Sequence, residues 1–123
     1  MRACLLCAVL ALSAPALADT PLRMLQNDSD APVKVQLDSF EREVPRYKDD
    51  TTLNLVVPQG EASLTLRTRD GLWHLSDRHG KLFAWKEGGE PRAISDRSGE
   101  YIMLWVDPTG RPFVRRWPYW YGR

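Results

Sequence analysis

The chain has 123 residues, of which 17 are Lys or Arg and 16 are Asp or Glu, giving a formal net charge of +1. This length suits a single domain, and the chain lacks the excess of positive charge that nonspecific nucleic-acid binding requires. We therefore expect one domain and no nucleic-acid partner.

Residues 1–18 have the layout of a secretory signal peptide. Arg2 precedes an apolar run from Ala3 to Leu12, and Ala16-Leu17-Ala18 forms a small-x-small cleavage triplet. The apolar run is shorter than the roughly 20 residues that a membrane-spanning helix needs. Cleavage near Ala18 predicts a mature protein in the bacterial periplasm or secreted from the cell.

The expected mature chain contains no cysteine, because Cys4 and Cys7 both lie in the predicted signal. We therefore expect a fold without disulfides, thiolate nucleophiles or thiolate metal ligands. Charge and aromatic content are uneven along this chain. Residues 19–66 have a net charge of −4, whereas residues 67–123 have a net charge of +4 and contain all five Trp. The second half is therefore expected to carry the aromatic chemistry of the protein.

In chain order, we predict an extended polar lead-in over 19–31, an all-β domain over 32–118 and an aromatic-basic tail over 119–123. Alternating apolar residues predict half-buried strands at 33–38, 51–57 and 61–68. The inward residues of these strands are Val33, Val35 and Leu37, then Leu53, Leu55 and Val57, then Ala62, Leu64 and Leu66.

Two connecting segments interrupt this pattern. Pro58-Gln59-Gly60 predicts a tight reversal between the second and third strands. Pro45 interrupts a spacing of Phe40, Val44 and Tyr47 that would otherwise suit a helix. The sequence around Pro45 is interpreted as an irregular charged excursion with at most one helical turn.

The second half repeats the pattern D-x-x-G-basic-x-Phe, at 77–83 and at 107–113, with a looser copy at 96–102. An Asp and a Gly at this spacing are typical of a type I hairpin turn followed by a G1 bulge. The pattern predicts that 72–76 pairs with 81–86 and that 100–107 pairs with 111–117. The apolar segment 101–106 is predicted to be a central strand.

These elements predict a single small antiparallel β-sandwich or barrel of about eight short strands. Catalysis has little support in the sequence, which contains no G-x-S-x-G, P-loop or H-E-x-x-H motif. We expect no enzyme activity and no cofactor. His74 and His79 suggest a weaker alternative, a periplasmic metal-handling protein, because two imidazoles could bind copper or zinc.

The ending VRRWPYWYGR supplies the candidate binding residues, which are Arg115, Arg116, Trp117, Tyr119, Trp120 and Tyr121. Tyr, Trp and Arg dominate binding hot spots. The tail could instead cover an open end of the fold, contact a membrane surface, or mimic the C-terminal signal of outer-membrane barrels. Trp73, Trp85 and Trp105 are expected to fill the core, and their alternative is a row of exposed rings.

From these features we expect a small exported, non-enzymatic binding protein of the bacterial envelope. Its partner is expected to be an envelope or secreted protein that docks on the aromatic-basic second half, and an inhibitor or immunity role belongs to this class. The alternative is a carbohydrate-binding module that stacks peptidoglycan or exopolysaccharide on Trp and Tyr. The opposite charges of the two halves also allow self-association.

Overall fold

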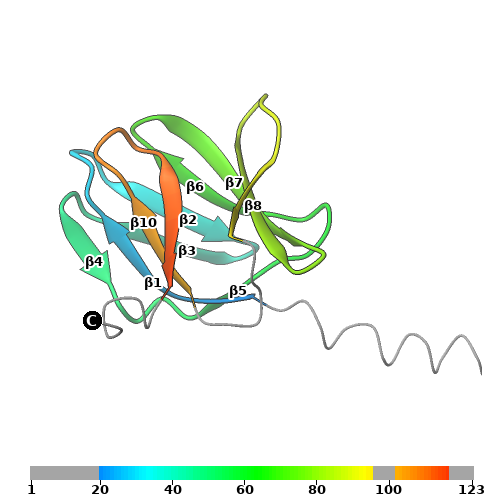
Figure 1. Ribbon diagram of the computed structural model, residues 1–123. Coiled ribbons are helices and arrows are strands. Elements are labelled where there is room, and N and C mark those ends of the chain that lie inside the picture. The colour runs from blue at the N-terminus through cyan, green and yellow to red at the C-terminus, as the bar shows by residue number, and fades with distance from the viewer. Residues whose placement is uncertain (1–19, 96–101, 117–123) are drawn as a thin grey trace, which may run out of the picture.

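The computed structural model describes residues 20–95 and 102–116, which form two β-sheets packed face to face (Figure 1). Sheet A contains β1 (Thr20–Asn27), β4 (Lys48–Asp50), β5 (Leu55–Val57), β10 (Ile102–Val106) and β11 (Pro112–Arg116). Sheet B contains β2 (Val33–Leu37), β3 (Phe40–Val44), β6 (Leu64–Thr68), β7 (Gly71–Arg78), β8 (Lys81–Lys86) and β9 (Arg92–Ser95).

The predicted all-β fold is confirmed, and of the two architectures it is the sandwich. Sheet A has the strand order β11-β10-β1-β4, with β5 also pairing β1, and sheet B has the order β3-β2-β6-β7-β8-β9. Neither order closes on itself among the described residues. The described residues contain eleven strands rather than about eight, and β1 pairs β10 in parallel although the other strand pairs are antiparallel.

The predicted lead-in is wrong as a description of 20–27, because these residues form β1 at the centre of sheet A. A register shift between Leu22 and Met24 changes which face the later residues occupy. As a result Leu22 and Leu25, three positions apart, are both fully buried in the core. The sequence therefore lacks the strict alternation that would have revealed a strand.

The predicted irregular excursion is also wrong, because residues 40–44 form β3, a hairpin partner of β2. Arg42 alternates in phase with the core residue Val44, and its guanidinium pairs with the carboxylate of Asp50. A charged residue at this position conceals the period of two. Pro45 follows the strand rather than interrupting it.

The predicted reversal at 58–60 does not join paired strands, since β5 belongs to sheet A and β6 to sheet B. The segment crosses between the sheets and bonds to β7. The Asp77 amide donates to the Pro58 carbonyl at 2.8 Å, and the Gly60 amide donates to the Asp77 carbonyl at 3.1 Å. Because β6 begins only at Leu64, Ala62 is exposed rather than inward.

Both predicted hairpin pairings are confirmed, and β10 lies between β11 and β1 as a central strand should. The turn at 107–110 has the predicted form, with Gly110 at φ 95° and its amide bonded to the Asp107 carbonyl. The turn after Arg78 differs, because His79 and Gly80 both have positive φ. Two such residues make the two-residue loop of a type I′ turn. The 96–102 copy lies almost wholly outside the described residues.

The core between the sheets draws on both layers. Its buried members are Leu22, Leu25, Leu53, Val57, Leu104 and Val106 near sheet A, and Val33, Val35, Val44, Leu64, Leu66, Trp73, Leu75, Leu82 and Ala84 from sheet B. Burial at about 25 cal/mol per Å² of apolar surface makes this cluster the main source of stability.

Polar contacts fix how the two sheets lie on each other. The hydroxyl of Thr20 in β1 donates to the buried carboxylate of Asp77 in β7. At the other end of the sandwich, the buried hydroxyl of Thr68 donates to the Gly110 carbonyl at 2.6 Å. A Cβ added at Gly110 would lie 2.7 Å from the Asp70 amide nitrogen, so the two turns touch through backbone.

We predict that Gly110→Ala lowers the free energy of unfolding by about 2–4 kcal/mol, because it adds both backbone strain and a backbone collision. Gly88→Ala is the matched control. Gly88 also has a positive φ, 85°, but a Cβ there would meet nothing within 4 Å. Strain alone should cost about 1 kcal/mol at Gly88. Urea unfolding measures the free energy of unfolding of both variants. Equal losses of this free energy would contradict the close contact between Gly110 and the Asp70 backbone.

Candidate functional site

The predicted tail site falls mostly outside the described residues. Arg115 and Arg116 are the last two residues of β11, where their backbones pair with Met103 and Ile102. Trp117, Tyr119, Trp120 and Tyr121 lie beyond the described residues. A candidate site within the described part of the second half lies at one end of the sandwich.

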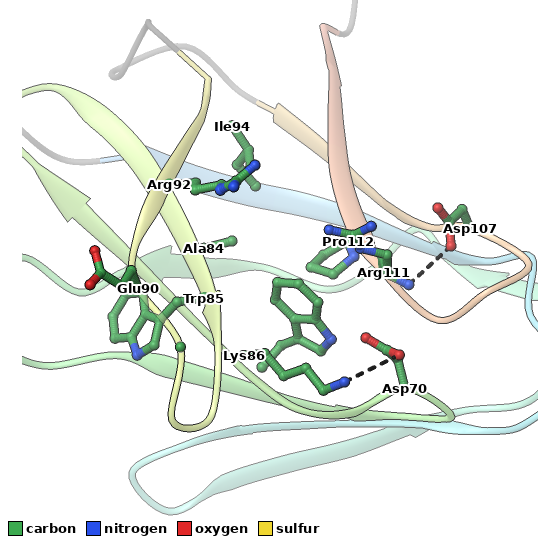
Figure 2. A pocket seen from close by; sticks show the side chains of 12 residues that line it. Asp70, Ala84, Trp85, Lys86, Glu90, Arg92, Ile94, Asp107, Arg111 and Pro112 are labelled. Atoms are coloured by element: carbon green, nitrogen blue, oxygen red, sulfur yellow. Dashed lines mark hydrogen bonds and ion pairs between the residues drawn. The ribbon is translucent and has the colours of Figure 1, made fainter.

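A pocket opens between the two sheets, at the end where three turns meet (Figure 2). These turns join β6 to β7, β8 to β9, and β10 to β11. The pocket has a volume of about 580 Å³. It is lined by Asp70, Trp73, Ala84, Trp85, Lys86, Gly89, Glu90, Arg92, Ile94, Asp107, Arg111 and Pro112. Every lining residue comes from the second half of the chain.

The floor of this pocket is apolar because it is the edge of the core. Trp73 and Ala84 belong to the buried cluster, Ile94 packs against it, and Pro112 is buried. The indole of Trp73 is only 9% exposed, and its Nε1 has no hydrogen-bond partner among the described residues. An apolar side chain from a ligand could therefore extend the core at this edge.

The rim of the pocket carries charge of both signs. Lys86 and Asp70 form an ion pair at 3.4 Å, and the guanidinium of Arg111 lies 5.9 Å from the centre of the Trp73 ring. Figure 2 shows Arg92 on the opposite wall from Arg111. Arg92 and Glu90 are exposed and form no ion pair with a described residue, so both remain available to a ligand.

Asp107 fixes the wall that carries Arg111. Its Oδ1 accepts hydrogen bonds from the Thr109 amide at 2.9 Å, the Thr109 hydroxyl at 2.6 Å and the Arg111 amide at 3.0 Å (Figure 2). Burial raises the pKa of the Asp107 carboxyl, but hydrogen bonds from Thr109, Arg111 and Gly110 outweigh burial and hold the pKa below its usual value. The ionised carboxylate thus holds the turn in shape.

Trp85 lies against its own neighbours, so the described Trp do not form a row of exposed rings. The His74 ring stacks on it at 5.2 Å with an interplanar angle of 14°, and the Arg78 guanidinium lies 4.9 Å from its centre. Trp73 is in the core, as predicted. Trp85 and Trp105 are half-buried outside the core cluster, so the prediction that they fill the core is wrong. The Trp105 ring lies 6.0 Å from Phe113.

The two histidines do not come together. His79 is exposed in the turn after β7, whereas His74 lies within β7. His74 Nδ1 lies 3.0 Å from the Ser63 hydroxyl, and Nε2 lies 2.5 Å from Glu87 Oε1. Among residues 20–95 and 102–116, no cluster of three or more His, Cys, Asp or Glu could hold a metal ion.

Ser63, His74 and Glu87 make a serine–histidine–carboxylate row that the sequence analysis did not identify. Ser76, on the same strand as His74, is not part of this row, because its buried hydroxyl donates to the Gly60 carbonyl at 2.7 Å. The Glu87 side chain is 66% exposed, so water screens the electrostatic attraction between its carboxylate and the His74 imidazole. The row joins the residue before β6, the strand β7 and the β8–β9 turn on the outer face of sheet B.

Comparison of the chain with models of known families, with curated proteins and with solved structures gives no significant match. The described residues also contain no helix long and apolar enough to span a membrane.

We predict that Asp107→Asn weakens the dependence of stability on acid pH. The folded pKa of Asp107 is below its usual value, so its stabilisation is fully present above the unfolded pKa of about 4. That stabilisation is lost as the pH falls through the folded pKa. The difference in unfolding free energy between pH 5 and pH 2 should therefore shrink in the variant. Asp49→Asn, at an exposed position in β4, is the control. An unchanged acid dependence in Asp107→Asn would contradict this role.

Proposed function

We propose that this protein is a small exported binding protein without catalytic activity. Its second half docks a protein partner of the bacterial envelope. The pocket between the sheets carries the proposal, since all of its lining residues lie between Asp70 and Pro112. The aromatic and basic residues of β11 and the tail continue from the same hairpin, so they adjoin this site in sequence.

The composition of the pocket supports a protein partner. Protein interfaces combine an apolar centre with a polar rim, and Trp and Arg are enriched among the residues that contribute most to binding. Here Trp73, Ala84, Ile94 and Pro112 form the centre, and charged side chains surround it. An extended segment of a partner could place an apolar side chain between the sheets and pair its charges with the rim.

Arg92 and Arg111 favour carboxylates on that partner. The Asp70 carboxylate is paired with Lys86, and the Asp107 carboxylate accepts the hydrogen bonds of its own turn. Two guanidinium groups on opposite walls therefore remain for acidic groups of the partner (Figure 2). Rim charges of this kind mainly steer association and select the partner.

A photo-crosslinking amino acid at Glu90 tests the proposal in the cells that produce the protein. The expected result is one discrete adduct with an envelope protein from Glu90, and none from the same group at Lys48. Lys48 is exposed in β4, on the far side of sheet A from β11. The same adduct from both positions, or none from Glu90, would contradict docking at this pocket.

Charge reversal then tests the rim. Arg92→Glu with Arg111→Glu should weaken the captured complex by about tenfold or more, as loss of paired interface charges does. Lys48→Glu with Lys81→Glu changes the net charge equally at exposed positions outside the pocket and should leave affinity unchanged. Equal losses in the two double variants would show an effect of net charge alone.

Two further measurements could overturn the proposal in other directions. Retention on insoluble peptidoglycan that disappears in Trp85→Ala would favour the carbohydrate-binding alternative. Hydrolysis of a p-nitrophenyl ester that disappears in Ser63→Ala would show that the serine–histidine–carboxylate row is catalytic. The proposal predicts neither retention nor hydrolysis above background.

A further inference from the structure

The outer face of sheet A carries a row of apolar residues beside polar positions such as Gln26 and Asp49, which is unusual for a face that does not contact the second sheet. Leu104 and Val106 of β10 point into the core. Since side chains alternate along a strand, Met103 and Trp105 point to the opposite face. Met103 is buried but is not a member of the core cluster, which agrees with this assignment.

Apolar residues cross this face from one side of the sheet to the other. Phe113 of β11 pairs with Trp105, Met24 of β1 pairs with Met103, and Pro21 of β1 pairs with Val56 of β5. We call these six residues the outer stripe: Phe113, Trp105, Met103, Met24, Pro21 and Val56. The outer face of sheet B instead carries polar positions such as Lys34, Thr65 and Arg67.

Exposure varies along the outer stripe. Met103 is only 1% exposed, whereas Val56 at the far side is 51% exposed. Neighbours within one sheet flank an outward side chain but do not lie above it. The outer face of a two-layer antiparallel sandwich ordinarily contacts water. Burial of Met103 on this face therefore requires a covering group.

We propose that the chain's own segment 117–121 covers the outer stripe. This segment, Trp-Pro-Tyr-Trp-Tyr, follows β11 directly, and β11 ends at Arg116, one residue past the partner of Met103. It supplies four aromatic rings beside an apolar face that lacks a described second layer. Pro118 has no amide to donate to a strand ladder, which favours departure of the chain from the sheet edge there.

The length of the segment fits this path. Five extended residues span about 16 Å at 3.3 Å each. Crossing from β11 over β10 and β1 to β5 takes three strand spacings of about 4.8 Å, or about 14 Å in total. The rings would then contact Met103 first and approach Val56 last, in line with the exposure of those two residues.

Oxidation of methionine by hydrogen peroxide tests the proposal, since the chain has three Met, of which Met24 and Met103 lie among the described residues. Met103 should oxidise slowly in the intact protein. It should oxidise about tenfold faster or more after Trp117→Ala with Trp120→Ala, because uncovered thioethers react faster. Tyr47→Ala, which removes an exposed ring elsewhere, should have no effect. Unchanged protection of Met103 in a monomeric Trp variant would overturn the proposal.

Disulfide trapping gives a second test that does not depend on destabilising the protein. With Cys4 and Cys7 changed to Ser, Val56→Cys with Trp120→Cys should form an intramolecular disulfide. Tyr47→Cys with Trp120→Cys should not, because Tyr47 precedes β4, which pairs with the opposite end of β1. Equal trapping of both pairs would overturn the proposal. Disulfide-linked dimers, with Met103 protection that depends on concentration, would instead assign the cover to a second copy of the chain.

The outcome is independent of the proposed function. The crosslink at Glu90 tests the pocket between the sheets, whereas Met103 oxidation tests the outer face of sheet A. If the segment covers the outer stripe, its rings complete this domain and the pocket is left as the docking site.

Discussion

The contact between the 107–110 turn and the turn before β7 determines how the two sheets meet at the end of the molecule that holds the pocket. Gly110 lies against the backbone of Asp70, and its carbonyl accepts the buried Thr68 hydroxyl at 2.6 Å. The same hydroxyl accepts the Asp70 amide at 3.0 Å. A side chain at Gly110 would force the turns apart, so the spacing of the sheets here depends on one residue without a Cβ.

This contact also positions the walls of the pocket. Asp70 and its ion-pair partner Lys86 lie on the sheet B side, while Asp107 and Arg111 lie on the hairpin of sheet A. Between them the edge of the core is open, and Trp73 and Pro112 form part of its floor. Turns fixed by backbone contacts form a preorganised site, so little ordering entropy would oppose binding.

Local sequence patterns predicted the parts of this fold that depend on neighbouring residues. The alternation of Val33 and Val35, and the Asp and Gly of the 107–110 turn, reflect contacts within a few residues. Two strands were not predicted, each for a local reason. In β1 the register shifts after Leu22, and in β3 the charged Arg42, which pairs with Asp50, takes a position in phase with the core residues. The parallel pairing of β1 with β10 joins segments about 80 residues apart, and no short pattern encodes such a pairing.

The pocket was not predictable for the same reason. Its lining comes from three turns and the strands that flank them, all between Asp70 and Pro112, and nothing in the sequence of one turn indicates the others. The excess of Trp and Arg did indicate the half of the chain that lines the pocket. His74 shows the limit of this reasoning, because its partners Ser63 and Glu87 come from neighbouring strands and turns rather than from its own strand.

The central claim is that a partner protein docks at the end of the sandwich where the three turns meet. Amide hydrogen exchange, measured on the protein with and without its crosslink-identified partner, tests this claim most directly. The account predicts slower exchange on binding in residues 86–94 and 107–112, with β2 and β3 unchanged. Slower exchange confined to β2 and β3 would contradict it.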